Sequence, residues 1–278
     1  MNDMDPMLEP FSWHHLGQWH LGLLPIVMLA LATAWYFWSA HSVPGWSGWR
    51  RVWFALAIIT TFLATQSVIG LYDMELFSAH MVQHLMLVMV AGPLFALSAP
   101  ADLWRATSPF GARVLDSRPM RLIQHPVFGF ALYAVFIPAT HLSVLFNWML
   151  EFSWFHHGEQ IAFLAVGYLF FRHAVGAEEG MQLHPGLRLV YVMAAVPVDT
   201  ITGLALAMSG HNPFPAYTHM MRMSDLPILE DLHLGGAIMW IGGDGLMLLM
   251  LFPLVVKWVK YETAKTKEID AELDRLGL

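Results

Sequence analysis

The chain has 278 residues, of which 57% are hydrophobic and only 13% are charged. Soluble domains carry roughly 25% charged residues, and a soluble core of this size could not hide so much apolar surface. The formal net charge of −7 and the lack of a basic patch exclude a nucleic-acid partner. The chain has no cysteine, which excludes disulfides and thiolate metal sites. The composition therefore indicates a polytopic membrane protein.

Seven runs of about 20 apolar residues follow one another along the chain, each long enough to cross a hydrocarbon core of roughly 30 Å as a helix. They cover about residues 20–40, 49–71, 77–98, 126–147, 153–175, 187–209 and 233–257. We therefore expect an all-α bundle of seven transmembrane helices over residues 20–258. An extracytoplasmic segment would precede it at 1–19, and a cytoplasmic tail would follow at 259–278. Residues 1–19 contain no Lys or Arg, so we expect no cleavable signal peptide.

Lys and Arg fall almost entirely on one side of this predicted bundle. Of the 14 such residues, only Arg222 lies on the side opposite to the connection at 99–125 and the C-terminal tail. Cytoplasmic loops of membrane proteins carry the excess of Lys and Arg. The sequence thus predicts that the N-terminus lies outside and the C-terminus lies in the cytoplasm.

Most of the 15 histidines fall on the opposite, outer side of the predicted bundle. The sharpest pattern is SAHMVQHLM at the start of the third span, where His80 and His84 are four residues apart. Both rings then project from one helix face, about one turn apart, so they can bind one metal ion. The plainer alternative is that both are interfacial histidines that hydrogen-bond to neighbouring helices.

Other predicted spans supply further histidines at a similar depth. His141 precedes the end of the fourth span by six residues and His157 follows the start of the fifth by four, which places both about 6–9 Å below the outer interface. His156 repeats the four-residue spacing with Gln160, and His233 opens the seventh span. The candidate metal ligands are therefore His80, His84, His141, His156, His157 and His233.

The composition of this outer side favours copper. Imidazole and thioether ligands accept Cu(I), and imidazole accepts Cu(II). Zinc could be held by three or four imidazoles, and haem by two histidines on facing helices. One outer loop gathers a candidate segment for copper capture, which could equally be an amphipathic loop on the membrane interface: His219, Met220, Met221 and Met223. We expect copper, with haem as the alternative cofactor.

Two carboxylates fall near the middle of predicted spans. Asp199 lies in the sixth span and Asp244 in the seventh. A carboxylate at this depth costs about 2.5–3.5 kcal/mol on insertion scales, so such residues normally face the bundle interior and mark a function. They could line an ion or proton path leading inward from the histidines, or simply hydrogen-bond to Thr200, Thr202 or the backbone.

Several sequence blocks then follow one another in a familiar order: SAHMVQHLMLVMVAGPLFALSAP, HPVFGFALY, HLSVLFN, HHGEQIAFLAVGYLFF and DLHLGGAIMWIGGD. Over roughly residues 20–258 the chain resembles the polytopic CtaG family of cytochrome c oxidase assembly proteins, which is linked to caa-type oxidases. The resemblance implies a seven-helix protein of the bacterial plasma membrane that handles copper for a haem–copper oxidase. The implied partners are the oxidase subunit that bears the copper centre, an extracytoplasmic copper chaperone and the lipid bilayer.

The resemblance carries ligand roles to His80, His84 and His141, and to His156 or His157. Two positions depart from the family pattern, because Gln160 stands where a histidine is expected and His233 stands where glutamine is more usual.

Two other functions stay open at this point. One is a b-type haem protein that passes electrons, and the other is a copper or proton-coupled transporter, which the mid-span carboxylates would favour. We expect no enzymatic activity, because the sequence shows no nucleophile–base arrangement and no phosphate-binding loop.

The predicted topology can be tested with reporters. A reporter fused after Leu278 is expected in the cytoplasm, and a tag within 210–225 is expected to react with a membrane-impermeant probe from outside. A C-terminus found outside would overturn the outer placement of the histidines.

Overall fold

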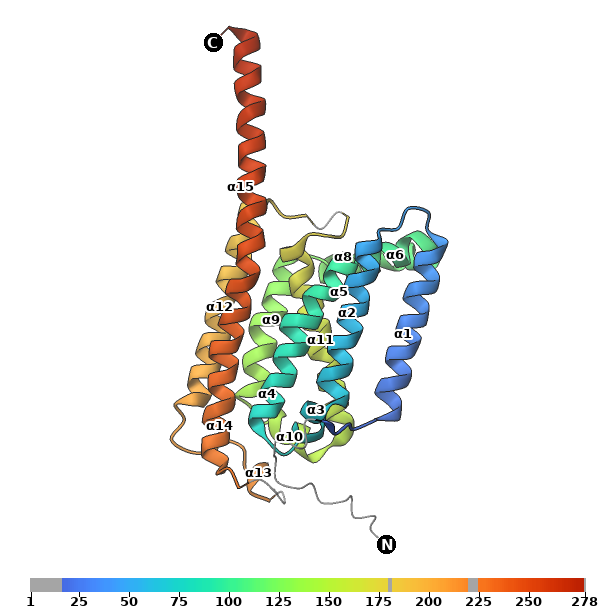
Figure 1. Ribbon diagram of the computed structural model, residues 1–278. Helices are drawn as coiled ribbons and strands as arrows, with labels where there is room; N and C mark the ends of the chain where they lie inside the picture. Colours follow the sequence, from blue (N-terminus) through green and yellow to red (C-terminus); the bar gives the residue numbers. More distant parts are fainter. Residues whose placement is uncertain (1–16, 180–181, 220–224, 278) are drawn as a thin grey trace.

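A computed structural model describes residues 17–179, 182–219 and 225–277, in which every regular element is a helix (Figure 1). The longer helices are α1 (Leu23–Ser42), α2 (Gly48–Gln66), α9 (Pro126–His141), α11 (Ser153–Val175), α12 (Pro185–Ala207) and α15 (Gly243–Leu276). The shorter ones are α3 (Val68–Tyr72), α4 (Phe77–Leu85), α5 (Gly92–Ser98), α6 (Pro100–Thr107), α7 (Pro109–Leu115), α8 (Arg118–Ile123), α10 (Leu145–Glu151), α13 (Ala216–His219) and α14 (Ile228–Ala237). Two π-helical turns, η2 (Met86–Ala91) and η3 (Ile238–Gly242), complete the set. The predicted all-α class is confirmed.

Five helical stretches of the described chain are long and apolar enough to cross a membrane: Leu23–Ser42, Gly48–Tyr72, Phe77–Thr107, Pro185–Ala207 and Ile228–Leu276. The number rises to six if α9 and α10, which are bent by 63° relative to each other, form one span. The chain is thus a multi-pass membrane protein. Helix α11 has 23 residues but is not among these stretches, and it carries His156, His157, Glu159 and Arg172. Seven spans and the orientation of the termini therefore stay predictions.

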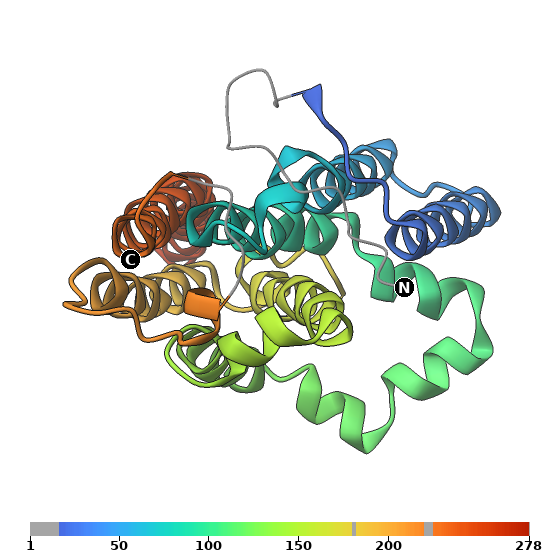
Figure 2. The same ribbon diagram turned by 90° about the horizontal axis from the view of Figure 1, so that it is seen from below.

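Helix α11 lies among the other helices and packs against α5, η2 and α9, while α12 packs against α9, α14 and α15 (Figure 2). Helix α1 lies at the periphery, and α6, α7 and α8 form an arc at one edge of the bundle. Figure 1 shows α6 and α8 at the end of the bundle from which the last turns of α15 project, and α3, α10 and α13 at the opposite end. The Arg-rich connection and the tail therefore share one end, as the sequence predicts.

Two predicted boundaries differ from the observed helices. The fourth predicted span, 126–147, is interrupted after His141, and α10 begins at Leu145, whose N–H donates to the Ser143 hydroxyl at 3.2 Å. The tail predicted at 259–278 continues α15 without a break as far as Leu276. The boundary after residue 258 therefore falls inside one helix.

The turn η2 joins α4 to α5 in front of a proline. Pro93 has no N–H to donate, and in a regular helix its ring would meet the carbonyl group of Met89. Just before Pro93 the backbone hydrogen bonds change from the α-helical to the π-helical pattern. The Gly92 N–H donates to the carbonyl oxygen of Leu87, five residues back. Single π turns of this kind are frequent at functional sites.

Pairs of glycines let two helix crossings come very close. A Cβ on Gly92 would lie 2.7 Å from the carbonyl carbon of Gly167, where α5 meets α11. A Cβ on Gly236 would lie 2.7 Å from the Gly203 oxygen, where α14 meets α12. Only residues without a side chain fit at these separations, so the crossings fix how closely the helices around α4 approach each other.

The N-terminus of α4 is capped by a side chain from α14. The Asp231 carboxylate accepts hydrogen bonds from the Phe77 N–H at 2.7 Å, the Ser78 N–H at 3.1 Å and the Ser78 hydroxyl at 2.6 Å. A carboxylate at this position satisfies backbone donors and interacts favourably with the helix dipole. The contact holds the start of α4 against α14.

The opposite end of α11 is fixed by a buried ion pair between Arg172 and Glu178. The Tyr168 hydroxyl also donates to Glu178 at 2.6 Å. The next residue, Glu179, donates its N–H to Asp102 of α6 at 3.1 Å. These contacts tie the segment after α11 to α6.

We expect Asp231→Ala to lower the free energy of unfolding by roughly 0.5–2 kcal/mol, because it removes the cap of α4. The measurement is thermal unfolding of the protein in detergent micelles. Glu230→Ala is the matched control, since Glu230 is the exposed neighbour on the same helix. An equal loss of stability in both variants would contradict a specific role for the cap.

Candidate metal centre

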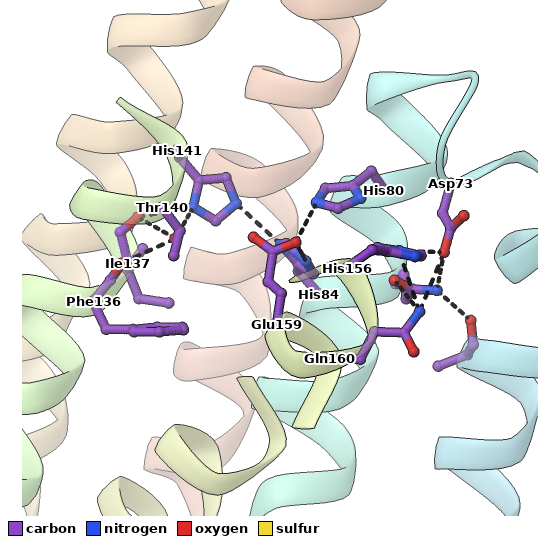
Figure 3. A network of polar contacts seen from close by, with 12 residues as sticks. Asp73, His80, His84, Phe136, Ile137, Thr140, His141, His156, Glu159 and Gln160 are labelled. Atoms are coloured by element: carbon purple, nitrogen blue, oxygen red, sulfur yellow. Dashed lines mark hydrogen bonds and ion pairs between the residues drawn. The ribbon is translucent and has the colours of Figure 1, made fainter. Parts of the chain in front are cut away.

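Two histidines of α4 and one glutamate of α11 meet inside the bundle (Figure 3). His80 Nε2 lies 3.8 Å and His84 Nε2 lies 4.0 Å from Glu159 Oε2, and one ligand atom from each residue lies within 4.8 Å of the others. Protein ligands usually lie about 2.0–2.2 Å from a zinc-sized ion, so two ligands of one ion can be about 4 Å apart. These three side chains, the inner cluster below, can therefore hold one metal ion.

Aromatic rings pack against the histidines of the inner cluster, which is almost fully buried. His80 is 0% exposed, and His84 and Glu159 are 5% exposed each. The ring of Phe163 stacks on His84 at a centroid separation of 3.6 Å, and Phe146 meets His80 edge-on at 5.2 Å. These contacts hold both imidazoles in place.

A short chain of hydrogen bonds sets the tautomer of His84. His141 Nδ1 lies 2.8 Å from the Ile137 carbonyl oxygen, which can only accept, so this nitrogen carries the proton. In the neutral ring His141 Nε2 is then an acceptor, and His84 Nδ1, at 3.1 Å, donates to it. The lone pair of His84 is thereby placed on Nε2, which faces Glu159. Such partners commonly orient metal-ligating histidines and raise their basicity.

His156 lies beside the inner cluster but is engaged elsewhere. Its Nε2 lies 3.1 Å from Asp73 Oδ2, which also accepts from Gln83 Nε2 at 2.5 Å. Gln160, one turn along α11, lies with its Nε2 3.3 Å from His156 Nε2. Because a carboxylate only accepts, His156 Nε2 carries a proton in this arrangement and is not a metal ligand there.

The polar atoms of the inner cluster fit a bound cation. His80 Nε2, His84 Nε2 and both carboxylate oxygens of Glu159 are buried and make no hydrogen bond within the described chain. Buried polar groups are almost always hydrogen-bonded, and an unpaired buried carboxylate is especially costly. A metal ion would give all three side chains a partner at once.

Methionines share a small cavity with His84 of the inner cluster. A small cavity of about 20 Å³ is lined by His84 and His141 together with Met81, Met89 and Met239. The same cavity reaches Asp199, whose Oδ2 accepts a hydrogen bond from the Tyr133 hydroxyl at 2.6 Å. The site therefore offers sulfur as well as imidazole in its immediate surroundings.

The two mid-span carboxylates take separate partners. Asp199 is 2% exposed and bonds to Tyr133, whereas Asp244 Oδ2 accepts from the Thr200 hydroxyl at 2.8 Å. The second oxygen of Asp244 is buried and makes no hydrogen bond within the described residues. Thr200 is one of the partners expected from the sequence, and a proton path through these residues stays a prediction.

The structure brings His80, His84 and His141 together and places His156 beside them, but it separates the remaining candidates. His157 Nδ1 lies 2.7 Å from the Ser153 carbonyl oxygen on its own helix, and His233 Nε2 lies 2.8 Å from the Ser209 carbonyl oxygen. The structure thus does not place His157 and His233 with the inner cluster. In the proposed capture segment, Met220, Met221, Met223 and the side chain of His219 lie outside the described residues.

Sequence reasoning missed two acidic members of the site, Glu159 and Asp73. Glu159 stands three residues after His156, close to its face of the helix, and a carboxylate inside an apolar span is itself a signal of function. Asp73 is the residue directly after α3, in the connection between α3 and α4. Neither belongs to a repeated histidine spacing.

The sequence of the chain matches a family model described as cytochrome c oxidase caa3 assembly factor over residues 29–261. The chain belongs to this family. The resemblance drawn from the sequence blocks is thereby confirmed, and the matched region contains every residue of the inner cluster.

The relatives of this caa3 assembly factor family member include mycobacterial proteins. A Mycobacterium bovis protein, named only as uncharacterized, is 27% identical over 218 residues, which cover 73% of this chain and 33% of the relative. An uncharacterized Mycobacterium leprae protein is 26% identical over 234 residues, which cover 78% of this chain and 35% of the relative. The chain thus spans about one third of the length of these curated relatives. No solved structure matches it.

We expect Glu159→Gln to weaken the binding of a metal ion, such as copper or zinc, by at least about tenfold, because the amide removes the only carboxylate among the three candidate ligands. The same substitution should raise the unfolding temperature of the metal-free protein, because it removes an unpaired buried carboxylate. Copper titration and thermal unfolding with and without metal measure the two effects. Glu151→Gln, at an exposed position, should change neither. Unaltered copper affinity in Glu159→Gln would remove this carboxylate from the ligand set.

Proposed function

We propose that the protein is an assembly factor for a haem–copper cytochrome c oxidase in the bacterial plasma membrane, and that it holds copper for delivery to the oxidase. The observation that carries the proposal is the set of buried, unpaired ligand atoms on His80, His84 and Glu159. Membership of the caa3 assembly factor family supplies the oxidase as the destination.

The chemistry of the site supports copper. Two imidazole nitrogens lie within reach of one ion, and Met81, Met89 and Met239 line the adjacent cavity with His84. Imidazole binds both oxidation states of copper, and thioether favours Cu(I). Two histidines and a glutamate also form a known zinc ligand set, so zinc is the competing metal.

Three protein ligands suit delivery better than storage. A site with fewer than four protein ligands keeps a position open for an incoming group, as catalytic zinc sites do. An incoming ligand from a partner could therefore bind the metal before the protein releases it. The proposed partners are the oxidase subunit that bears the copper centre as acceptor and an extracytoplasmic copper chaperone as donor.

The geometry favours copper over haem. His80 and His84 lie on one helix with ring centroids 4.0 Å apart, so they do not face each other across a porphyrin plane. His84 Nδ1 and His141 Nε2 are hydrogen-bonded at 3.1 Å, and the cavity beside them measures about 20 Å³. A bis-histidine haem needs its two ligands on opposite faces of the ring.

A copper or proton-coupled transporter is the second candidate. The cavity that His84 and His141 share with Asp199 favours it, because a mid-span carboxylate beside a metal site can exchange a proton.

The test combines metal analysis with oxidase maturation. We expect the double variant His80→Ala/His84→Ala to lose most of its copper and to lower oxidase activity in cells, while the protein still accumulates. Mass spectrometry of the purified protein would measure copper and zinc together, and a reduced-minus-oxidised spectrum would report any haem.

His233→Ala is the matched control, because His233 Nε2 lies 2.8 Å from the Ser209 carbonyl oxygen, apart from the inner cluster. This variant should retain wild-type copper content. Unchanged copper in the double variant would leave only a packing role for His80 and His84.

A further inference from the structure

A second hollow lies beside the inner cluster, at the start of α11. It measures about 390 Å³ and is lined by polar and apolar residues of three separate segments. His20 on its wall is exposed, whereas Asp73 and His156, also on its wall, are only 1% and 7% exposed. The hollow, called the entry cavity below, therefore leads from exposed side chains to buried ones.

His156 forms the wall between the entry cavity and the inner cluster. It lines the cavity, and its ring centroid lies 6.1 Å from that of His80. Figure 3 shows His156 between Asp73 and Glu159, with His80 close by. A metal ion crossing from the cavity to the inner cluster would pass this ring.

The Asp73–His156 pair has the chemistry of a transfer position. The Asp73 carboxylate supplies a negative charge at the buried end of the cavity, and it accepts from His156 Nε2 and from Gln83. An arriving cation would bind the Asp73 carboxylate in place of the His156 N–H, and His156 Nε2 could become a ligand once its proton had passed to solvent in the cavity. His20 and His157 line the same cavity and offer imidazoles farther out.

We propose that the entry cavity is the passage by which copper reaches and leaves the inner cluster, with the Asp73–His156 pair as its inner transfer position. This inference rests on the proposed copper-handling function. The occupant is a single cation that accepts imidazole and carboxylate ligands.

If the entry cavity is the passage for copper, residues on its wall affect the rates of copper binding and release. Residues that only support the fold or bind the ion would instead change the dissociation constant. An obstacle in a passage slows entry and exit by the same factor, so the dissociation constant, which is their ratio, stays unchanged. We expect Leu71→Trp, on the wall of the entry cavity, to slow copper loading and release by about tenfold each, with the same dissociation constant. His156→Phe, which keeps a ring but loses the imidazole, should behave likewise.

The experiment uses the full chain in nanodiscs and Cu(I) supplied from a coloured chelator, with stopped-flow absorbance for loading and excess chelator for release. Leu71→Ala opens the same position and should not slow either rate. Leu187→Trp places an equal bulk in the apolar groove between α9 and α12 and should leave both rates unchanged.

The outcomes separate the passage from the function on which it rests. Unchanged rates in Leu71→Trp would overturn the passage while leaving copper binding intact. A weaker dissociation constant with faster release in His156→Phe would make His156 a ligand of the bound state and overturn its transfer role. A wild-type protein that binds no copper would overturn the proposed function and the passage together.

Discussion

The burial of the Glu159 carboxylate is the constraint on which the rest of the site depends. Moving an ionised carboxylate out of water costs several kcal/mol unless a cation or strong hydrogen bonds compensate it. Both oxygens of Glu159 lack a hydrogen bond within the described chain, and Oε2 lies 3.8 Å from His80 Nε2 and 4.0 Å from His84 Nε2. The helix packing that encloses these three side chains thus favours a bound positive ion. Metal binding and folding stability are coupled in such a site, because an ion that binds only the folded state stabilises it.

The surroundings decide which histidines can offer a lone pair. The carbonyl group of Ile137 fixes the proton of His141, which in turn fixes that of His84 and leaves Nε2 of His84 free for a metal. The carboxylate of Asp73 does the opposite at His156, because it keeps Nε2 protonated. Buried histidines of this site therefore differ in whether Nε2 has a free lone pair, because each one has a different hydrogen-bond partner.

Sequence reasoning predicted the all-α class and the ends of several helices, including α11, because long apolar runs specify helices directly. It also predicted that His80 and His84 share one face of a helix, since that follows from helical periodicity alone. It could not predict which face of α11 meets α4, because this depends on crossings such as Gly92–Gly167. Glu159 was missed for that reason, and His233 was grouped with the others by depth, although its Nε2 meets the Ser209 carbonyl oxygen. The sequence gives only a weak indication of the break after His141. That indication is Ser143, whose hydroxyl accepts a hydrogen bond from the Leu145 N–H at the start of α10.

The π turn between His84 and Pro93 adds a wide loop of backbone to an otherwise regular helix. Each residue of an α-helix turns the chain by about 100°, so the extra residue in the wide turn changes how the side chains of α4 are rotated about the helix axis relative to those of α5. Helix α5 is held at the Gly92–Gly167 crossing, and α4 is held at its start by Asp231. A chain shortened by one residue within Met86–Ala91 could keep both attachments only by straining the backbone, or it would rotate His80 and His84 away from Glu159. The length of this segment, more than the identity of its apolar side chains, therefore determines whether His80 and His84 face Glu159.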